Sequence, residues 1–548
     1  MEMEMVTVHE SKGQSESTWT DGRNLLGSDR KSGSGLSRDA ADLARVGKKD
    51  VLKRRFGLTS IIGFTCSLML TWEAIMMNLG VGLENGGPAG LVYGYIGVWI
   101  GFISVSIVMG ELASMMPTPL KLSVVKAGGQ YHWTSILAPP SAKRFVSYIT
   151  GCICIFAWTA GPTAAIYLAG SVLQSTIASN NPQYDPKGWH VTLMMWAILG
   201  ICTIMNTCLG MVLPIVEVFI LIIHVFGFFA VLIPLLYLGP RAKASAVFAT
   251  SYELGGWNDV TLATFIGMKG AVAAFLGTDG AVHMAEEVAN SSTAVPQSML
   301  AAVLINGGMG FGIMIAFLFT AGDISTILKS GAAYPFINIL EDATGSKSAA
   351  ITLSSMVSAL QICAGLAGIS SGSRMLWAFS REKAIPGWQW ISQVQTRVGI
   401  PFHSTIVIVI AAGLLALINI GSSVVLNIIL SLVLQAFFTS YIISLSMILY
   451  RRWKGDIAEP GPNIPREVMV WGPFRLKGWI GIVNNIFAII FSVIMMFFGC
   501  WPTTKHPSPS EVNYSVAIFV GVSLLCMAYY FLRARKLYKG PVVEVVEA

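Results

Sequence analysis

The stretch F-L-G-T-D-G-A-V-H-M-A-E-E (Phe275–Glu287) decides the fold, because it places charged side chains inside an otherwise apolar segment, Leu262–Val288. Its glycines, Gly277 and Gly280, enclose a threonine and an aspartate. A charged side chain in the hydrocarbon of a bilayer costs roughly 2.5–3.5 kcal/mol even on the mildest scales. The stretch therefore predicts a membrane helix broken between the glycines, with a substrate or a coupling ion bound at the break.

The polar residues of this stretch have a helical spacing. Asp279, His283 and Glu287 recur every four residues and therefore share one helical face. Thr278 or Asp279 can cap a second half-helix, and an aspartate near a helix N-terminus is expected to stay ionised. Two interpretations of His283 stay open: a hydrogen-bonded buried histidine, or a proton-coupling group, because histidine titrates near neutral pH.

The composition is that of a polytopic membrane protein. The chain has 548 residues, of which 54% are hydrophobic and 12% charged, whereas soluble domains carry about 25% charged residues. Eight cysteines lie within apolar segments and form no C-x-x-C pair, which indicates small core residues rather than a metal site. Signatures of soluble enzymes are missing, so we expect no enzymatic activity, no cofactor and no nucleic-acid partner.

Twelve apolar segments of about 20 residues can be marked as membrane-spanning helices. They begin near Phe56, Gly90, Phe145, Trp189, Gly210, Leu262, Gln297, Ser348, His403, Val424, Trp479 and Tyr514. Lysine and arginine concentrate before span 1, after span 12, and in the loops between spans 2 and 3, 8 and 9, and 10 and 11. The positive-inside rule then places both termini in the cytosol.

Two further predictions depend on this orientation. Glu286 and Glu287 lie near the cytosolic end of span 6, where we expect a gate or an ion pair with Arg381 or Lys383. The sequence N-Y-S at Asn513 is a glycosylation sequon on the outer side, directly before span 12.

Span 1 carries a lone carboxylate, Glu73, directly after Thr71 and Trp72. One interpretation is a helix-to-helix hydrogen bond. The other is a counter-charge for a cationic substrate, with Trp72 or Trp158 supplying an aromatic face, because cation–π contacts commonly hold quaternary ammonium groups.

Span 5 supplies a second set of candidates for coupling. Glu217 and His224 lie seven residues apart and share one face, which fits either a proton pathway or a structural pair. Span 8 carries the hydroxyl residues Ser354, Ser355 and Ser358, which suit close helix packing but could also ligate a cation. The coupling ion predicted from these residues is a proton, with sodium as the alternative.

Four motifs together resemble the fungal amino acid/choline transporter family of the amino acid–polyamine–organocation superfamily. They are N-G-G-P-A-G (Asn85–Gly90), G-G-x-Y-x-W (Gly128–Trp133), G-T-D-G-A-V-H-M-A-E-E (Gly277–Glu287) and S-R-x-x-W-A-F-S-R-E-x-A-I-P (Ser373–Pro386). The W-E pair of span 1 and the D-x-A-x-H-M-A-E-E run of span 6 resemble the choline-permease branch more than the GABA-permease branch.

The resemblance implies an all-α membrane protein with a LeuT-type fold. Helices 1–5 (56–240) and 6–10 (241–450) would form a 5+5 inverted repeat in which helices 1 and 6 are discontinuous. Helices 11 and 12 (451–535) would be peripheral, with a disordered cytosolic tail at 1–55 and a second tail at 536–548. Substrate would bind between the two breaks and cross by alternating access. The substrate-binding residues implied are Thr71, Trp72, Glu73, Phe275, Gly277, Thr278 and Asp279.

One departure from the superfamily pattern bears on the substrate. Amino acid carriers usually have a glycine-rich turn in span 1, but Met69–Glu73 contains no glycine and ends in an acid that would repel a carboxylate. The absence of Gly and Pro between Phe64 and Leu79 also means that span 1 itself does not indicate a break.

We therefore predict an importer of a small cationic or zwitterionic nitrogen compound, with a choline-like amine favoured, in a fungal plasma membrane. The alternatives are an amino acid or GABA permease, possibly serving a metabolite pathway, and, less favoured, a transport-defective nutrient receptor.

Overall fold

The computed structural model describes residues 55–115, 128–181, 183–322, 333–395, 400–421, 425–461, 469–507 and 512–540, together with residues 324 and 328. The predicted tails at 1–55 and 536–548 therefore lie largely outside the described residues. Parts of the loops between the second and third and between the tenth and eleventh spans also lie outside them.

The described chain is built almost entirely of helices. The first half contains α2 (Leu58–Met69), α3 (Thr71–Met77), α4 (Leu79–Glu84), α5 (Gly87–Met115), α6 (Gln130–Leu137), α7 (Lys143–Asn180), α8 (Gly188–Thr207), α9 (Leu213–Leu238), α10 (Ala244–Phe248), α11 (Val260–Gly267), α12 (Lys269–Ala273), α13 (Gly280–His283) and the 3₁₀ turn η1 (Ala285–Glu287). The second half contains α14 (Ser291–Thr320), α16 (Pro335–Thr344), α17 (Lys347–Arg381), α18 (Trp388–Ile391), α19 (Phe402–Leu415), α20 (Ile418–Gly421), α21 (Val425–Lys454), the paired strands β1 (Ile457–Ala458) and β2 (Met469–Val470), α22 (Gly478–Gly499), α23 (Ser515–Tyr529), the π-helical turn η2 (Tyr530–Ala534) and α24 (Arg535–Leu537).

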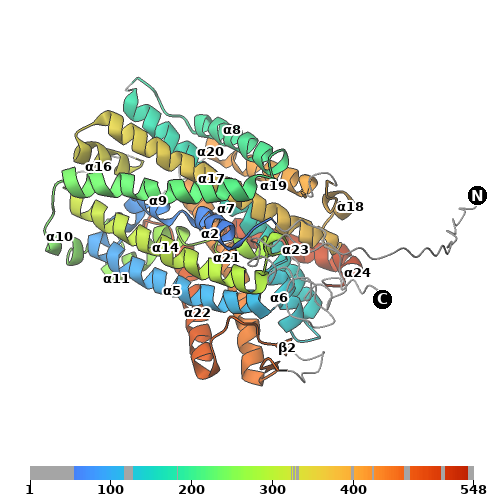
Figure 1. Cartoon of the computed structure of the whole chain (residues 1–548). Helices are drawn as coiled ribbons and strands as arrows, with labels where there is room; N and C mark the ends of the chain where they lie inside the picture. Colours follow the sequence, from blue (N-terminus) through green and yellow to red (C-terminus); the bar gives the residue numbers. More distant parts are fainter. Residues whose placement is uncertain are drawn as a thin grey trace, which may run out of the picture.

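Within the described residues, 11 helices are long and apolar enough to cross a membrane. The predicted sixth span accounts for the twelfth segment, because it is interrupted and contributes only the shorter apolar stretch Val260–Ala273. Figure 1 shows the long helices running side by side, with α8 and α16 toward one edge and α22 toward the other. The predicted twelve-segment helical architecture is confirmed in this form.

The two predicted breaks are both present. Span 6 is helical in α11 and α12, leaves the helix after Ala273, and resumes at Gly280, with Gly277 at φ +101° between them. Span 1 changes direction at Leu70, which has φ 39° and ψ 54°. Leucine rarely adopts this left-handed conformation. The break in span 1 therefore lies at a residue that does not predict one, since neither a glycine nor a proline is present there.

Burial separates central helices from peripheral ones. The most apolar window of span 1 (Leu58–Met77) is 83% buried by the rest of the protein, whereas the window in the last span (Ser515–Leu537) is only 11% buried. Span 1 therefore lies in the centre of the bundle and the last span at its margin. The exact boundaries of the two predicted repeats stay predictions.

The two described ends of the chain lie at one face of the bundle. The backbone of Phe56 pairs with that of Val288 just beyond η1, and the Tyr538 hydroxyl lies 2.6 Å from the Ser147 hydroxyl at the start of α7. We call this the terminal face and the other the opposite face. A chain that crosses the bundle an even number of times has both of its ends at the same face, as is found here.

Candidate functional site

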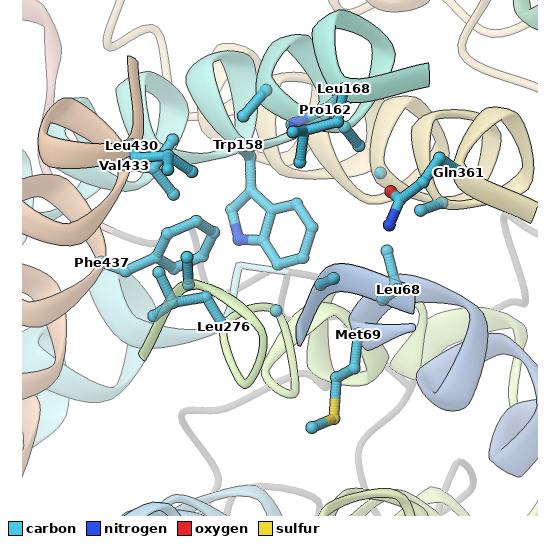
Figure 2. A pocket seen from close by; sticks show the side chains of 18 of the residues that line it. Leu68, Met69, Trp158, Pro162, Leu168, Leu276, Gln361, Leu430, Val433 and Phe437 are labelled. Atoms are coloured by element: carbon cyan, nitrogen blue, oxygen red, sulfur yellow. The ribbon is translucent and has the colours of Figure 1, made fainter. Parts of the chain in front are cut away.

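A cavity of about 80 Å³ lies at the level of the two helix breaks. Met69 and Ala74 line it from either side of the break in span 1, and Gly277 lines it from the break in span 6. The remaining walls come from α7, α17 and α21 (Figure 2). None of the described residues that line this cavity is charged, so these walls are mainly apolar.

Two aromatic rings form one wall of the cavity. Trp158 of α7 and Phe437 of α21 meet edge to face, with ring centroids 5.3 Å apart and planes at 80°. Figure 2 shows the Trp158 indole in the middle of the cavity, with Phe437 on one side and Gln361 of α17 across from it. Gln361 and Asn78 are the polar side chains of the lining. Such a wall suits the apolar substituents of a cation and its positive charge.

Asp279 lies directly behind the aromatic wall and is fully buried. Its carboxylate accepts hydrogen bonds from Gln130 Nε2 (2.6 Å), Tyr441 Oη (2.6 Å) and Trp158 Nε1 (3.3 Å). The donors come from α6, α21 and α7, so this one carboxylate joins three helices to span 6. Hydrogen bonds of this kind fix the position of the carboxylate. His283 Nε2 lies 3.8 Å from Asp279 Oδ2, which is beyond hydrogen-bond distance.

The turn before α6 approaches the histidine closely. A side chain at Gly129, which has φ +54°, would place its Cβ 2.7 Å from His283 Cε1. Glycine is therefore required at this position to seat α6, with Gln130 at its first turn, against span 6.

The predicted residues of span 1 do not line the cavity. The Thr71 hydroxyl donates to the Ala274 carbonyl (2.8 Å), which ties the two breaks together. Trp72 and Glu73 point toward α9, where Glu73 Oε1 lies 2.7 Å from His224 Nδ1. The structure thus brings together Glu73 and His224, which were predicted as separate candidates. Asp279 is the carboxylate that lies behind the cavity wall.

The predicted residues of span 6 have different positions. Gly277 lines the cavity, whereas Phe275 packs against Phe102 and Tyr95 of α5, with both centroid distances at 5.4 Å. Thr278 is buried next to Asp279 but is not part of the cavity lining. These roles in substrate binding stay predictions.

Glu217 of α9 is fully buried, and neither of its carboxyl oxygens has a hydrogen-bond partner within the described residues. Its backbone carbonyl packs against Gly63 of α2, where an added Cβ would come within 2.9 Å of it. The close approach of α2 and α9 places Glu217 two turns closer to the terminal face than His224.

Ion pairs close the terminal face below Asp279. Arg374 Nε of α17 lies 2.9 Å from Glu287 Oε1, and both side chains are buried. Glu286 lies 3.9 Å from Arg381 Nη1, as one predicted pairing requires. The Glu287 carbonyl also accepts from the N–H groups of Arg55 (2.9 Å) and Phe56 (3.0 Å), which holds the start of span 1 against the end of span 6.

Asn513, the predicted glycosylation site, uses its side-chain nitrogen in the fold. Nδ2 donates to the Ser431 hydroxyl (2.9 Å) and to the Cys500 carbonyl (3.2 Å). A glycan would be attached to this atom, and glycosylation at Asn513 stays a prediction.

Sequence reasoning missed several residues of the site, namely Gln130, Gln361, Arg374 and Tyr441. A usable signal existed for Gln130 and Arg374, which belong to the G-G-Q-Y-x-W and S-R-x-x-W motifs. The others are isolated polar groups within apolar spans, and only their contacts give them a role.

Comparisons with known proteins agree with this geometry. A family model described as amino acid permease matches residues 56–523. The choline transporter of Saccharomyces cerevisiae is 28% identical over 490 residues, which cover 88% of this chain and 82% of that protein. The GABA-specific permease of the same yeast is 27% identical, over 92% of this chain and 86% of its own length. The swainsonine transporter of Arthroderma benhamiae is 26% identical, over 92% and 96%. These relatives are transporters and not enzymes.

The fold also matches a solved structure. The crystal structure of the manganese transporter of Eremococcus coleocola in complex with an aromatic bis-isothiourea substituted compound superposes with a TM-score of 0.51. The match covers 87% of this chain and 95% of that one at 12% identity, so it shows the fold alone. The predicted LeuT-type architecture is confirmed by this likeness.

Proposed function

Because this chain belongs to the amino acid permease family, we propose that it carries a small cationic or zwitterionic nitrogen compound across a membrane by alternating access. A choline-like amine is the favoured substrate. The observation that carries this choice is the position of Trp158, whose ring lines the cavity while its indole N–H donates to Asp279.

A positive charge in this cavity would be attracted in two ways. Cation–π contact with a desolvated indole contributes up to about 2 kcal/mol. The Asp279 carboxylate behind the ring adds a Coulombic attraction that is poorly screened away from water. The three methyl groups of a quaternary ammonium group would meet apolar and aromatic walls without leaving a donor unpaired.

An amino acid or GABA substrate would use the polar side of the same cavity. Its carboxylate would require a donor, and the amides in the lining are Gln361 and Asn78, of which Asn78 Nδ2 already donates to the Ala74 carbonyl (2.8 Å). The identities to the choline transporter and the GABA-specific permease differ by one per cent and do not separate the two. We favour choline because, among the residues that the structure describes, no lysine, arginine or histidine lines the cavity to balance a substrate carboxylate.

The cavity extends toward the opposite face, which supports entry of the substrate from that face. Its lining extends along α7 to Leu168 and along α21 to Leu430, both on the side of Asp279 away from the terminal face. The terminal side is closed by the Glu287–Arg374 pair. We propose a plasma membrane location with cytosolic termini, import toward the terminal face, and a proton as the coupling ion.

The test is solute counterflow with the full chain reconstituted in liposomes loaded with unlabelled choline. Labelled choline should accumulate transiently, and a competition panel should contain choline, ethanolamine, GABA, arginine and neutral amino acids. Choline should compete most strongly. Competition by neutral amino acids alone would contradict the proposed substrate.

A further inference from the structure

A second buried polar cluster lies across span 1 from the cavity. Glu73 of α3 contacts His224 of α9 (Oε1–Nδ1 2.7 Å), and Asn306 of α14 contacts the other ring nitrogen (Oδ1–Nε2 2.8 Å). All three side chains are buried, at 0%, 1% and 0% exposure. None of the three lines the cavity, and α9 and α14 contribute no residue to it.

The contacts of Asn306 determine which ring nitrogen of His224 carries hydrogen. Asn306 Nδ2 donates to the Cys66 carbonyl (3.1 Å), which can only accept. The amide oxygen must therefore be the atom that faces His224 Nε2. Since that oxygen can only accept, Nε2 carries a hydrogen.

The contacts of the other ring nitrogen, Nδ1, then determine where the remaining proton lies. The Trp72 indole N–H, which can only donate, lies 3.1 Å from His224 Nδ1, so Nδ1 presents its lone pair. Glu73 Oε1 lies 2.7 Å from the same atom and must carry a proton to form a hydrogen bond there. Without that proton a carboxylate would oppose the lone pair. If Nδ1 carried a hydrogen as well, two N–H donors, those of Nδ1 and of the Trp72 indole, would face each other.

We propose that Glu73 and His224 form the site that binds the coupling proton, with Asn306 and Trp72 positioning the imidazole. This inference rests on the proposed transport function and names the ion site that would drive it. In the described state the proton is held as a carboxylic acid, with its O–H donating to Nδ1. Its loss leaves one negative charge on Glu73, and its return restores a neutral pair.

The geometry links this proton to the substrate cavity through one short helix. Glu73 is followed directly by Ala74, which lines the cavity, and both belong to α3. The helix is separated from α2 by the left-handed Leu70. A substrate that shifts α3 would change the distance from Glu73 to His224, which lies on α9, and so the affinity for the proton.

Other titratable groups lie on the helices packed around the pair, and one of them supplies a control. Cys66 of α2 and Cys363 of α17 lie within electrostatic range of Glu73. On α9, Glu217 is the next carboxyl group toward the terminal face and is fully buried. From the remaining neighbours of α3, Lys269 of α12 donates to the Trp501 carbonyl (2.8 Å), and α16 contributes the carboxyl groups of Glu341 and Asp342.

The transport experiment compares uptake of choline with and without an inward proton gradient, in liposomes whose membrane voltage is clamped. The wild-type rate should rise severalfold with the gradient. In Glu73→Gln the ratio of the two rates should fall to unity, whereas the matched control Glu341→Gln should keep the wild-type ratio. A wild-type ratio in Glu73→Gln would overturn the proposal.

An infrared experiment tests the proton site without requiring transport, so the proposed function and the proton site can fail separately. Failure of counterflow with every compound of the panel would refute the proposed function. The substrate-free wild type should still show the carbonyl absorption of a protonated carboxyl group that is lost in Glu73→Gln and shifted in His224→Gln. Identical absorption in wild type and Glu73→Gln would overturn the proton site.

Discussion

Trp158 lines the central cavity with its ring and at the same time donates its indole N–H to Asp279, at 3.3 Å. The contact joins the surface that a substrate would meet to a carboxylate held by two further donors. Asp279 itself does not line the cavity and contacts the N–H edge of a ring that does. In the proposed function, recognition of a positive charge and closure of the bundle around span 6 would depend on the same side chains.

Replacing Trp158 should show whether its aromatic ring, and not only its volume, contributes to the binding of choline. Trp158→Phe keeps a ring and should raise the KM for choline only a fewfold. Trp158→Leu should raise it roughly 30-fold, since a cation–π contact with a desolvated ring contributes about 2 kcal/mol. Uptake kinetics at matched surface expression measure both variants. Equal KM values for the two would show that the ring face is not used.

Thr71→Val should loosen the connection between the two breaks. The substitution keeps the shape of the side chain but removes the hydrogen bond to the Ala274 carbonyl. We expect a loss of about 1 kcal/mol of stability, together with slower transport. Thermal unfolding in detergent and counterflow rates test this, with Thr65→Val as the control, because Thr65 donates only within its own helix, to the Ile61 carbonyl. Equal effects of the two substitutions would contradict a special role for Thr71.

Gly277→Ala should impair transport through the backbone. Gly277 has φ +101°, a conformation that an L-residue adopts only with strain, at a position that lines the cavity. The matched control is Gly256→Ala, since Gly256 has φ +76° in a loop with no heavy atom within 4 Å of the added Cβ. Each substitution should cost about 1–3 kcal/mol in backbone strain. Only Gly277→Ala should lose transport, and equal losses in both would refute a specific role for the break.

Breaking the Glu287–Arg374 pair should open the terminal face. Removing one partner of a buried ion pair typically costs about 3–5 kcal/mol, because the other charge is left uncompensated. Arg374→Met should therefore increase labelling, from the terminal side, of a cysteine placed near His283. The exchange of both charges, Glu287→Arg with Arg374→Glu, should restore protection. Unchanged labelling in Arg374→Met would show that the pair does not close this face.

The sequence predicted the helical spans well, because hydrophobic length alone marks them. It also placed the break in span 6, where Gly277 and Gly280 enclose polar residues in an apolar segment. The break in span 1 could not be read from its residues, since Leu70 takes a left-handed conformation that tertiary contacts impose. That break was expected only because the chain resembles a transporter family with a discontinuous first helix.

The partners within the site were beyond the reach of sequence patterns. Glu73 and His224 were each singled out, yet they lie 151 residues apart along the chain, and helical spacing says nothing about contacts between different helices. Gln130 was overlooked because it begins the short helix α6 between spans 2 and 3, and only the packing of α6 brings it to Asp279, 149 residues later. Such pairings are set by packing of the whole bundle.

The most direct test of the account compares choline with its uncharged isostere, in which carbon replaces the quaternary nitrogen, as competitors in counterflow by wild type and Asp279→Asn. The wild type should prefer choline strongly, and Asp279→Asn should lose most of that preference while Asp259→Asn, altered in an exposed helix cap, keeps it. Equal competition by the two compounds in the wild type, or an undiminished preference in Asp279→Asn, would contradict selection of positive charge by the Trp158–Asp279 pair.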